Sequence, residues 1–161
     1  YLFWKICEIA AEVSLPLQCH TGMGQIINTD ILQLNNVIKN NPETKFVLLH
    51  CGFPWVDDIL SMVDGYHNVY PDLTWVPILS YTASNRILHQ LIEMTQIDKL
   101  CWGCDTWTSE ESYGAVLAFR RVVSEVLSEM CQEGYLSCEE ACYTAGQIWR
   151  GNALKLFGFE D

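Results

Sequence analysis

Basic residues are scarce in this chain. Only 9 of the 161 residues are Lys or Arg, against 20 Asp and Glu, which gives a formal net charge of -11. Nucleic acids and anionic membranes are bound by clusters of basic side chains, and the nine here are spread thinly along the sequence. The composition therefore argues against both partners. It is compatible with an enzyme that acts on a small molecule, and also with a generic soluble protein.

Long apolar runs are also missing. A membrane-spanning helix needs about 20 consecutive apolar residues, and no stretch of this sequence reaches that length. Residues 1–13 are partly apolar, but they include Lys5, Glu8 and Glu12, which suits neither a signal peptide nor a membrane anchor. We therefore expect a cytoplasmic protein.

Cysteine is abundant, but its placement does not suit a disulfide scaffold. The eight cysteines lie within apolar runs, and a chain of this size can bury a core without covalent cross-links. We expect them to be reduced and mostly buried. Cys101 and Cys104 have the spacing of redox and zinc motifs, but on a strand their sulfurs would point to opposite faces. Cys138 and Cys142 are spaced to share one face of a helix.

Short apolar runs alternate with helical patterns along the whole sequence. The runs predict strands that end near residues 20, 50, 72 and 105, the last of them over 99–105. The helical patterns cover residues 2–13, 30–40, 55–66, 83–95, 112–132 and 148–157, and a further helix begins at Ser137. Strands separated by helices indicate an α/β fold with a parallel sheet. We treat 1–161 as one partial domain, because a complete (β/α)8 barrel typically takes about 250 residues.

Polar side chains close three of the predicted strands. His20, His50 and Asp105 each follow an apolar run, and such positions form the active site of a (β/α) barrel. A single histidine is more often a packed residue bonded to a backbone carbonyl, but three equivalent positions favour a site. We predict His20 as a metal ligand, His50 as a second ligand or proton donor, and Asp105 as ligand and base. Asp72 holds the same place on the third strand, where it could equally cap a loop.

Residues near these strand ends could line a substrate pocket. Gln18 shares the face of His20 on the first predicted strand, because strand side chains alternate with a period of two. Trp75, Arg86, Trp107 and Glu111 follow later strand ends. We predict that these five residues bind substrate, although tryptophans in such positions more often belong to the core or the rim. His67 and His89 fall before a strand and within a helix, so they are interpreted as surface or packing residues.

Five short sequence segments, taken together, resemble those of a known family. They are Leu-Pro-Leu-Gln-Cys-His-Thr-Gly at 15–22, Phe-Val-Leu-Leu-His-Cys-Gly at 46–52, Asn-Val-Tyr-Pro-Asp-Leu at 68–73, Gly-Cys-Asp-Thr-Trp at 103–107 and Arg-Gly-Asn-Ala-Leu-Lys-Leu-Phe-Gly at 150–158. They resemble the C-terminal half of the amidohydrolase-related family of metal-dependent hydrolases (amidohydrolase 2 type). More narrowly, they resemble its nodulin-like branch, whose members can be fused to a glutamine-synthetase domain. The resemblance implies a TIM (β/α)8 barrel with a zinc or similar divalent ion.

The resemblance also implies roles for individual residues. His20 matches the metal-binding histidine of strand five, His50 the histidine of strand six, and Asp105 the aspartate of strand eight. Glu111 matches an acidic residue that recurs after that aspartate in the nodulin-like branch. The family's early His-x-His pair has no counterpart here, since no two histidines stand that close. The chain would therefore supply about strands 5–8 of the barrel with their helices.

Two functions follow as expectations. The first is a metal-dependent hydrolase, or a related decarboxylase, acting on a C–C or C–N bond of a small polar substrate, with zinc as the expected metal. The second is a non-catalytic half barrel that self-associates or supports a fused domain. The chain could be a fragment of a longer enzyme, a half barrel completed by another chain, or an inactive remnant, and we favour the first. Exposed strand edges predict a homo-oligomer or a missing N-terminal half as partner.

Overall fold

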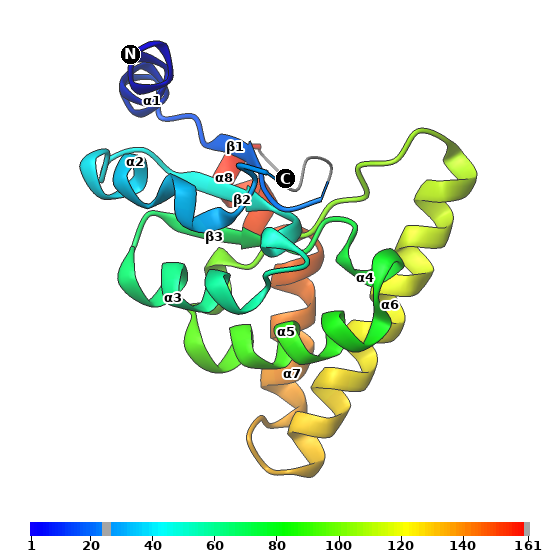
Figure 1. The fold of residues 1–161 in the computed structure, drawn as a ribbon. Helices are drawn as coiled ribbons and strands as arrows, with labels where there is room; N and C mark the ends of the chain where they lie inside the picture. The colour runs from blue at the N-terminus through cyan, green and yellow to red at the C-terminus, as the bar shows by residue number, and fades with distance from the viewer. Residues whose placement is uncertain (24–26, 160–161) are drawn as a thin grey trace.

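A parallel sheet of three strands lies at the centre of the computed structural model, which describes residues 1–23 and 27–159 (Figure 1). The strands are β1 (Leu17–His20), β2 (Phe46–Leu49) and β3 (Val69–Asp72), in the spatial order β1-β2-β3. The register pairs His20 with Leu49, and Leu49 with Asp72. The carboxyl ends of the three strands therefore meet at one edge of the sheet, as the sequence predicts.

Helices connect the strands and extend the fold beyond β3. The first half contains α1 (Leu2–Glu12), a 3-10 turn (Ile31–Leu34) continuing into α2 (Asn35–Asn40), a 3-10 turn at His50–Gly52 and α3 (Asp57–Gly65). The second half contains α4 (Val76–Leu79), α5 (Tyr81–Met94), a 3-10 turn (Ile97–Lys99), α6 (Ser109–Gln132), α7 (Cys138–Gly146), a π-helical turn (Gln147–Gly151) and α8 (Asn152–Phe157). In Figure 1, α1 stands apart at one end, α5 and α7 lie below the sheet, and α6 descends along the right-hand side.

The alternation of strand side chains divides the core into two layers. Phe46 and Leu48 of β2 are fully buried in the main core, together with apolar residues of the surrounding helices. Val47, between them, points to the other face, where it packs with Cys101 and with Leu156 of α8. Both faces of β2 are therefore covered, which explains why its sequence is a continuous apolar run.

The prediction of a fourth strand over 99–105 is wrong. Residues Ile97–Lys99 form a 3-10 turn, and the segment that follows makes only one bridge to the sheet, between Asp72 and Cys101. The side chain of Asn152 donates hydrogen bonds to the carbonyls of Ile97 and Leu100. These backbone acceptors are thus satisfied by a side chain, and no second strand lies beside the segment among the described residues.

Other details differ from the sequence prediction. The helix expected over 30–40 is a 3-10 turn followed by α2, and α4 was not predicted at all. Only four of the eight cysteines are buried (Cys7, Cys19, Cys51 and Cys101), while Cys138 and Cys142 are exposed, so the expectation of mostly buried thiols is wrong for α7. All eight are free thiols. No helix in the described part of the chain is long and apolar enough to cross a membrane.

Candidate functional site

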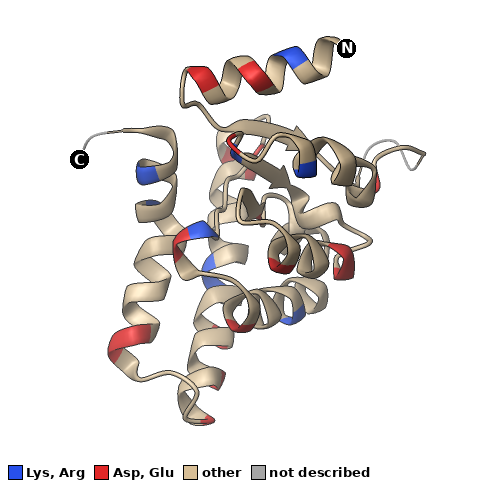
Figure 2. Cartoon of the chain, turned by 90° about the vertical axis from the view of Figure 1, so that its left-hand side faces the viewer, with Lys and Arg blue, Asp and Glu red and all other residues tan. Residues whose placement is uncertain are grey.

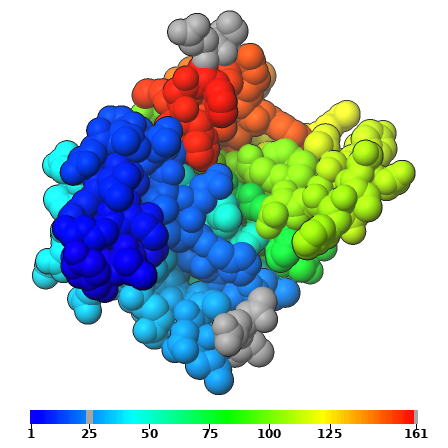
Figure 3. All heavy atoms as spheres, turned by 90° about the horizontal axis from the view of Figure 1, so that it is seen from above, coloured from blue at the N-terminus to red at the C-terminus, as the bar shows by residue number. Residues whose placement is uncertain are grey.

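The three residues that close the predicted strands converge in space. The ring centroids of His20 and His50 lie 4.6 Å apart, and Nε2 of His50 lies 4.0 Å from Oδ2 of Asp105. His50 is fully buried, His20 is exposed, and the Asp105 side chain is 53% exposed. The site is therefore closed where His50 lies and open to solvent where His20 and Asp105 lie. Seen from above, the molecular surface is hollowed between the N-terminal part of the chain and the green segment near residue 100 (Figure 3).

Hydrogen bonding fixes the protonation of the His50 ring. Its Nδ1 lies 3.0 Å from the carbonyl oxygen of Thr74. A carbonyl only accepts hydrogen bonds, so Nδ1 carries the proton and Nε2 keeps a free lone pair. That Nε2 atom is buried and has no hydrogen-bond partner. Burial also lowers the pKa of His50, an effect that outweighs the opposing hydrogen bond to Thr74. The ring is thus held neutral, with an unpartnered acceptor between His20 and Asp105.

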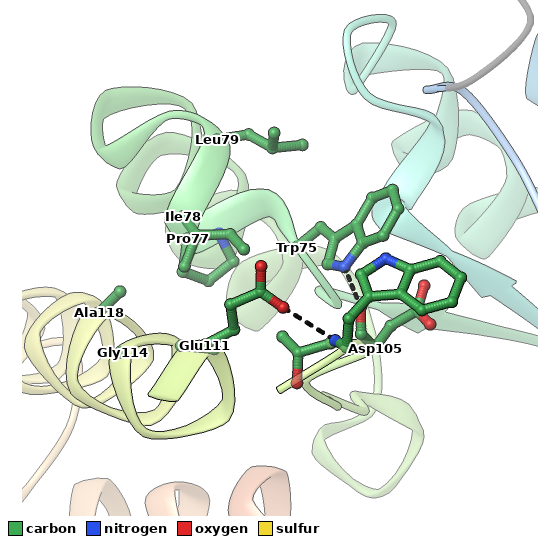
Figure 4. Close-up of a pocket in the computed structure, with 11 residues that line it drawn as sticks. Trp75, Pro77, Ile78, Leu79, Asp105, Glu111, Gly114 and Ala118 are labelled. Carbon is green, nitrogen blue, oxygen red and sulfur yellow. Dashed lines mark hydrogen bonds between the residues drawn. The ribbon is translucent and has the colours of Figure 1, made fainter. Parts of the chain in front are cut away.

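Unusual backbone conformations mark the same place. His50, Trp75 and Asp105 have φ angles of 66°, 66° and 46°, values that residues other than glycine rarely adopt. The Trp75 ring stacks on His50 at a centroid distance of 4.7 Å, and its indole N–H donates to the carbonyl oxygen of Asp105 (Figure 4). Strained residues that contact one another are a common feature of functional sites. No sequence signal predicts these three angles, because left-handed positions usually carry glycine or asparagine.

A buried threonine joins the loops that follow β1 and β2. The hydroxyl of Thr21 donates to the carbonyl of Leu49 at 2.6 Å and accepts from the amide of Gly52 at 3.0 Å. Gly22, the next residue, has φ +72°, and a Cβ there would lie 2.1 Å from the carbonyl oxygen of Phe53. The two loops are therefore held in direct contact, which sets His20 beside His50. The sequence pattern did not predict this role of Thr21.

Asp72 acts as the cap of a loop. Its side chain accepts hydrogen bonds from the amide and the hydroxyl of Thr74, and Thr74 in turn presents its carbonyl to His50. Burial raises the pKa of the Asp72 carboxyl. Of the two alternatives for this residue, the contacts favour the capping role, and they make Asp72 a positioning residue for His50.

A pocket of about 650 Å³ opens beside Asp105. It is lined by Trp75, Asp105, Trp107, Glu111 and apolar residues of α4 and α6 (Figure 4). The Trp107 side chain is 91% exposed. The Glu111 carboxylate accepts hydrogen bonds from the amides of Trp107 and Thr108, at 2.9 and 3.2 Å. Three of the five predicted substrate residues (Trp75, Trp107 and Glu111) are thus brought to one pocket.

The other two predicted substrate residues lie apart from that pocket. Gln18 lines a smaller cavity of about 220 Å³, together with Asp72, Thr74 and Asp105. It therefore lies near the site, on the same face of the sheet as its register partner Val47. Arg86 of α5 forms an ion pair with Asp57 and lines a separate shallow pocket on α5 and α6. The structure does not bring Arg86 to the site.

The donor types at the site suit a divalent metal, but the set is incomplete. Two imidazoles and one carboxylate are ligands that zinc and similar ions accept, and the unpartnered Nε2 of His50 fits such a role. Within residues 1–23 and 27–159, however, no three His, Cys, Asp or Glu side chains are close enough to hold an ion together. Additional donors or a small rearrangement would be needed to complete the coordination.

Comparisons with known proteins give the sequence context. A family model described as amidohydrolase matches residues 1–159. The protein fluG of Emericella nidulans is 31% identical over 152 residues, which cover 91% of this chain and 18% of the relative. The chain therefore spans less than a fifth of the length of this relative.

Solved structures support the fold. A protein described as a metal-dependent hydrolase, from Lactobacillus casei ATCC 334, superposes with a TM-score of 0.85 at 20% identity over 98% of this chain and 43% of its own. Uronate isomerase from Thermotoga maritima superposes with a TM-score of 0.79 at 17% sequence identity, and the match covers 97% of this chain and 40% of the isomerase. A TIM-barrel protein from Bordetella bronchiseptica superposes with a TM-score of 0.64 at 16% sequence identity, and the match covers 96% of this chain and 50% of that protein. At these identities the likeness shows the fold alone, and the chain spans half or less of each solved chain.

Proposed function

The chain belongs to the amidohydrolase family, and we propose that it carries part of the active site of a metal-dependent hydrolase. The observation that carries this proposal is the neutral, buried His50, whose unpartnered Nε2 faces His20 and Asp105. The match to the amidohydrolase family over residues 1–159 supports the same reaction class. We further propose that the parent enzyme cleaves a C–N or C–C bond, or removes carbon dioxide, in a small polar substrate.

Each residue of the site has a definite task in this proposal. His20 and His50 supply imidazole nitrogens to a divalent ion, with zinc as the expected metal, and Asp105 supplies a carboxylate. The bound ion would supply Lewis acidity, which polarises a carbonyl or a water molecule. Asp105 is half exposed and can accept a proton from water, while the hydrogen bond from Nδ1 of His50 to Thr74 keeps that ring in one tautomer. Trp75, Trp107 and Glu111 line the space for the substrate.

We also propose that the barrel is completed outside these 161 residues, so that the chain corresponds to about strands 5–8. The solved structures are of chains roughly twice as long, and this chain aligns with 40–50% of each. The missing metal donors would then come from the remaining strands, which agrees with the incomplete set observed here.

Zinc titration tests the proposal on the chain itself. Isothermal titration calorimetry of the chelator-treated chain is expected to show weak binding of one zinc ion per chain. His20→Ala and Asp105→Asn should each weaken it by roughly tenfold or more, because each removes one of the metal donors that the proposal assigns to this chain. His67→Ala is the matched control, since His67 is exposed and lies outside the site, and it should bind like the unmodified chain. Equal affinity for His20→Ala and His67→Ala would refute the assignment.

A second candidate function is a non-catalytic assembly module. The observation that favours it is the apolar surface of α1 and the residue after it, where Leu2, Ile6, Ile9 and Val13 are about half exposed or more. Large exposed apolar patches mark interaction surfaces. This function predicts an oligomer whose sedimentation does not change with zinc, and which dissociates when Ile6 and Ile9 are both replaced by Glu. If the unmodified chain sediments as a monomer, this second candidate function is refuted.

A further inference from the structure

Three cysteines gather where α6 meets α7, away from the candidate metal site. Cys131 lies in the last turn of α6, Cys138 is the first residue of α7, and Cys142 follows one turn later. All three line one surface groove of about 500 Å³ between the two helices. Cys131 lies near the end of the 24-residue α6, roughly 30 Å along the helix from Glu111 of the pocket beside Asp105. The proposed hydrolase function makes no use of these thiols.

Two of the three thiols lie close together in the fold. Cys131 and Cys138 line the same groove, and the Cys131 thiol donates a hydrogen bond at 3.7 Å to the carbonyl of Ser137, the residue directly before Cys138. The chain reverses between them at Gly134, whose φ of +77° suits a tight turn. This reversal places the end of α6 against the start of α7, so the proximity follows from the backbone and not from chance side-chain placement.

The environment separates these thiols from the buried cysteines. Burial raises the pKa of Cys19 and of Cys101 to about 12, and raises that of Cys51 well above its usual value, so these three stay protonated and inert. Cys138 is exposed and is the first residue of α7, so a small oxidant reaches its sulfur directly. Cys131 is half-buried, and desolvation together with Cys138 raises its pKa. Cys138 is therefore the better first nucleophile of the pair.

We propose that Cys131 and Cys138 form a peroxide-sensitive dithiol that closes reversibly to an intramolecular disulfide. The Cys138 thiolate attacks one oxygen of hydrogen peroxide, the O–O bond breaks, and the departing hydroxide takes a proton to become water. Cys131 then attacks the sulfenic sulfur of Cys138, the S–O bond breaks and the S–S bond forms. The second hydroxide takes up the Cys131 proton, so two thiols lose two electrons and one peroxide becomes two water molecules.

Glutamate-specific digestion tests this pairing directly. Cleavage after Glu129, Glu133, Glu139 and Glu140 puts the three cysteines on three separate peptides, 130–133, 134–139 and 141–160. After treatment with a small excess of hydrogen peroxide, the unreduced digest should contain peptide 130–133 linked to peptide 134–139. The intact chain should lose two titratable thiols and two mass units, and dithiothreitol should restore both. No linked peptide, or a link that includes 141–160, would overturn the proposal.

Single substitutions give the order of the two steps. Cys131→Ser should abolish the linked peptide and leave Cys138 as a sulfenic acid that dimedone traps. Cys142→Ser is the matched control, because it removes a neighbouring thiol of the same groove, and it should leave the yield of linked peptide within about twofold of the unmodified chain. Dimedone labelling of Cys142 in place of Cys138, or loss of the linked peptide in Cys142→Ser, would contradict the assignment. The mapping of the unmodified chain does not depend on how either variant folds.

Discussion

The buried hydroxyl of Thr21 gives the clearest prediction for a single residue. It bonds both the carbonyl of Leu49 and the amide of Gly52, and each of these backbone groups loses its partner if the hydroxyl is removed. Thr21→Val keeps the side-chain shape, so it should lower the free energy of unfolding by about 2–4 kcal/mol, since one unsatisfied buried polar group costs about 1–3 kcal/mol. Urea denaturation followed by tryptophan fluorescence measures the change.

The control for Thr21→Val is an exposed threonine. Thr82→Val on α5 replaces a hydroxyl that faces solvent, so we expect a change within about 0.5 kcal/mol. Because Thr21 also holds the loops that carry His20 and His50, Thr21→Val should weaken zinc binding while Thr82→Val does not. If both variants were equally stable, the hydroxyl would not join the two loops in solution.

Single residues of the site were predicted to very different degrees. His20 and His50 follow β1 and β2, and the geometry of neighbouring parallel strands brings such positions together. Asp105 reaches the same place although its predicted strand did not form. Thr74 could not be found in this way, because its contribution is a backbone carbonyl that any residue could supply. The left-handed angles of His50, Trp75 and Asp105 were equally hidden, since residue type predicts such angles mainly for glycine. Arg86 was predicted to line the pocket, but its guanidinium group forms an ion pair with Asp57 and lines a different pocket.

At the scale of elements, two capping boxes give a matched pair of predictions. Thr108 caps α6 and Ser137 caps α7, each with a glutamate three residues later that bonds back to the cap. Replacing either cap by Ala should lower the free energy of unfolding by about 1 kcal/mol. The two effects should add within about 0.5 kcal/mol, because the caps lie at opposite ends of α6. Urea unfolding of both single variants and the double variant measures this.

Comparing the two cap variants distinguishes a loss of stability from an effect on the candidate site. Thr108 orders the loop that carries Trp107, whereas Ser137 lies beside the thiol groove. Thr108→Ala should therefore disturb the Asp105 pocket, and the equally destabilised Ser137→Ala should not. Comparable quenching of exposed tryptophan by acrylamide in both variants would contradict this difference.

The elements themselves were predicted well where periodicity decides and poorly where contacts decide. The strands that end at His20, near His50 and at Asp72 agree with β1, β2 and β3. The strand over 99–105 failed because an apolar run forms a strand only when a partner accepts its hydrogen bonds. The short helix α4 was not predicted. Trp75 precedes it with a left-handed φ angle and Pro77 occupies its first turn, and neither feature indicates a helix unless the preceding loop is known.

At the scale of the whole molecule, the 20 acidic side chains outnumber the 9 basic ones. Figure 2 shows Asp and Glu spread over several helices, with Lys and Arg scattered among them. The net charge of -11 adds a general repulsion that weakens as carboxylates take up protons. The pH dependence of stability therefore combines this general effect with the contributions of a few buried groups, and a variant is needed to isolate any one of them.

His50 provides such a test in the metal-free chain. The unfolded chain binds a proton at the ordinary histidine pKa of about 6.5, whereas burial lowers the pKa of His50 in the folded state. Its contribution to stability is therefore fully present above about pH 6.5. Below that pH the unfolded state takes up the proton first, so the free energy of unfolding falls by up to about 1.4 kcal/mol per pH unit. His50→Gln should lack this component, and the stability difference between the two chains should shrink as the pH falls from 7.5 to 5.5.

Urea unfolding at five pH values, with a chelator present throughout, measures that difference. Asp72, whose pKa is raised by burial, acts in the opposite sense because stability falls as pH rises through its titration, but it is common to both chains and largely cancels. His67→Gln is the control, since His67 is exposed, and it should follow the pH dependence of the unmodified chain. Parallel curves for His50→Gln and the unmodified chain would mean that the buried ring gains a proton as easily as in water. In that case the free lone pair on Nε2, on which the proposed metal site depends, would not be maintained by the fold.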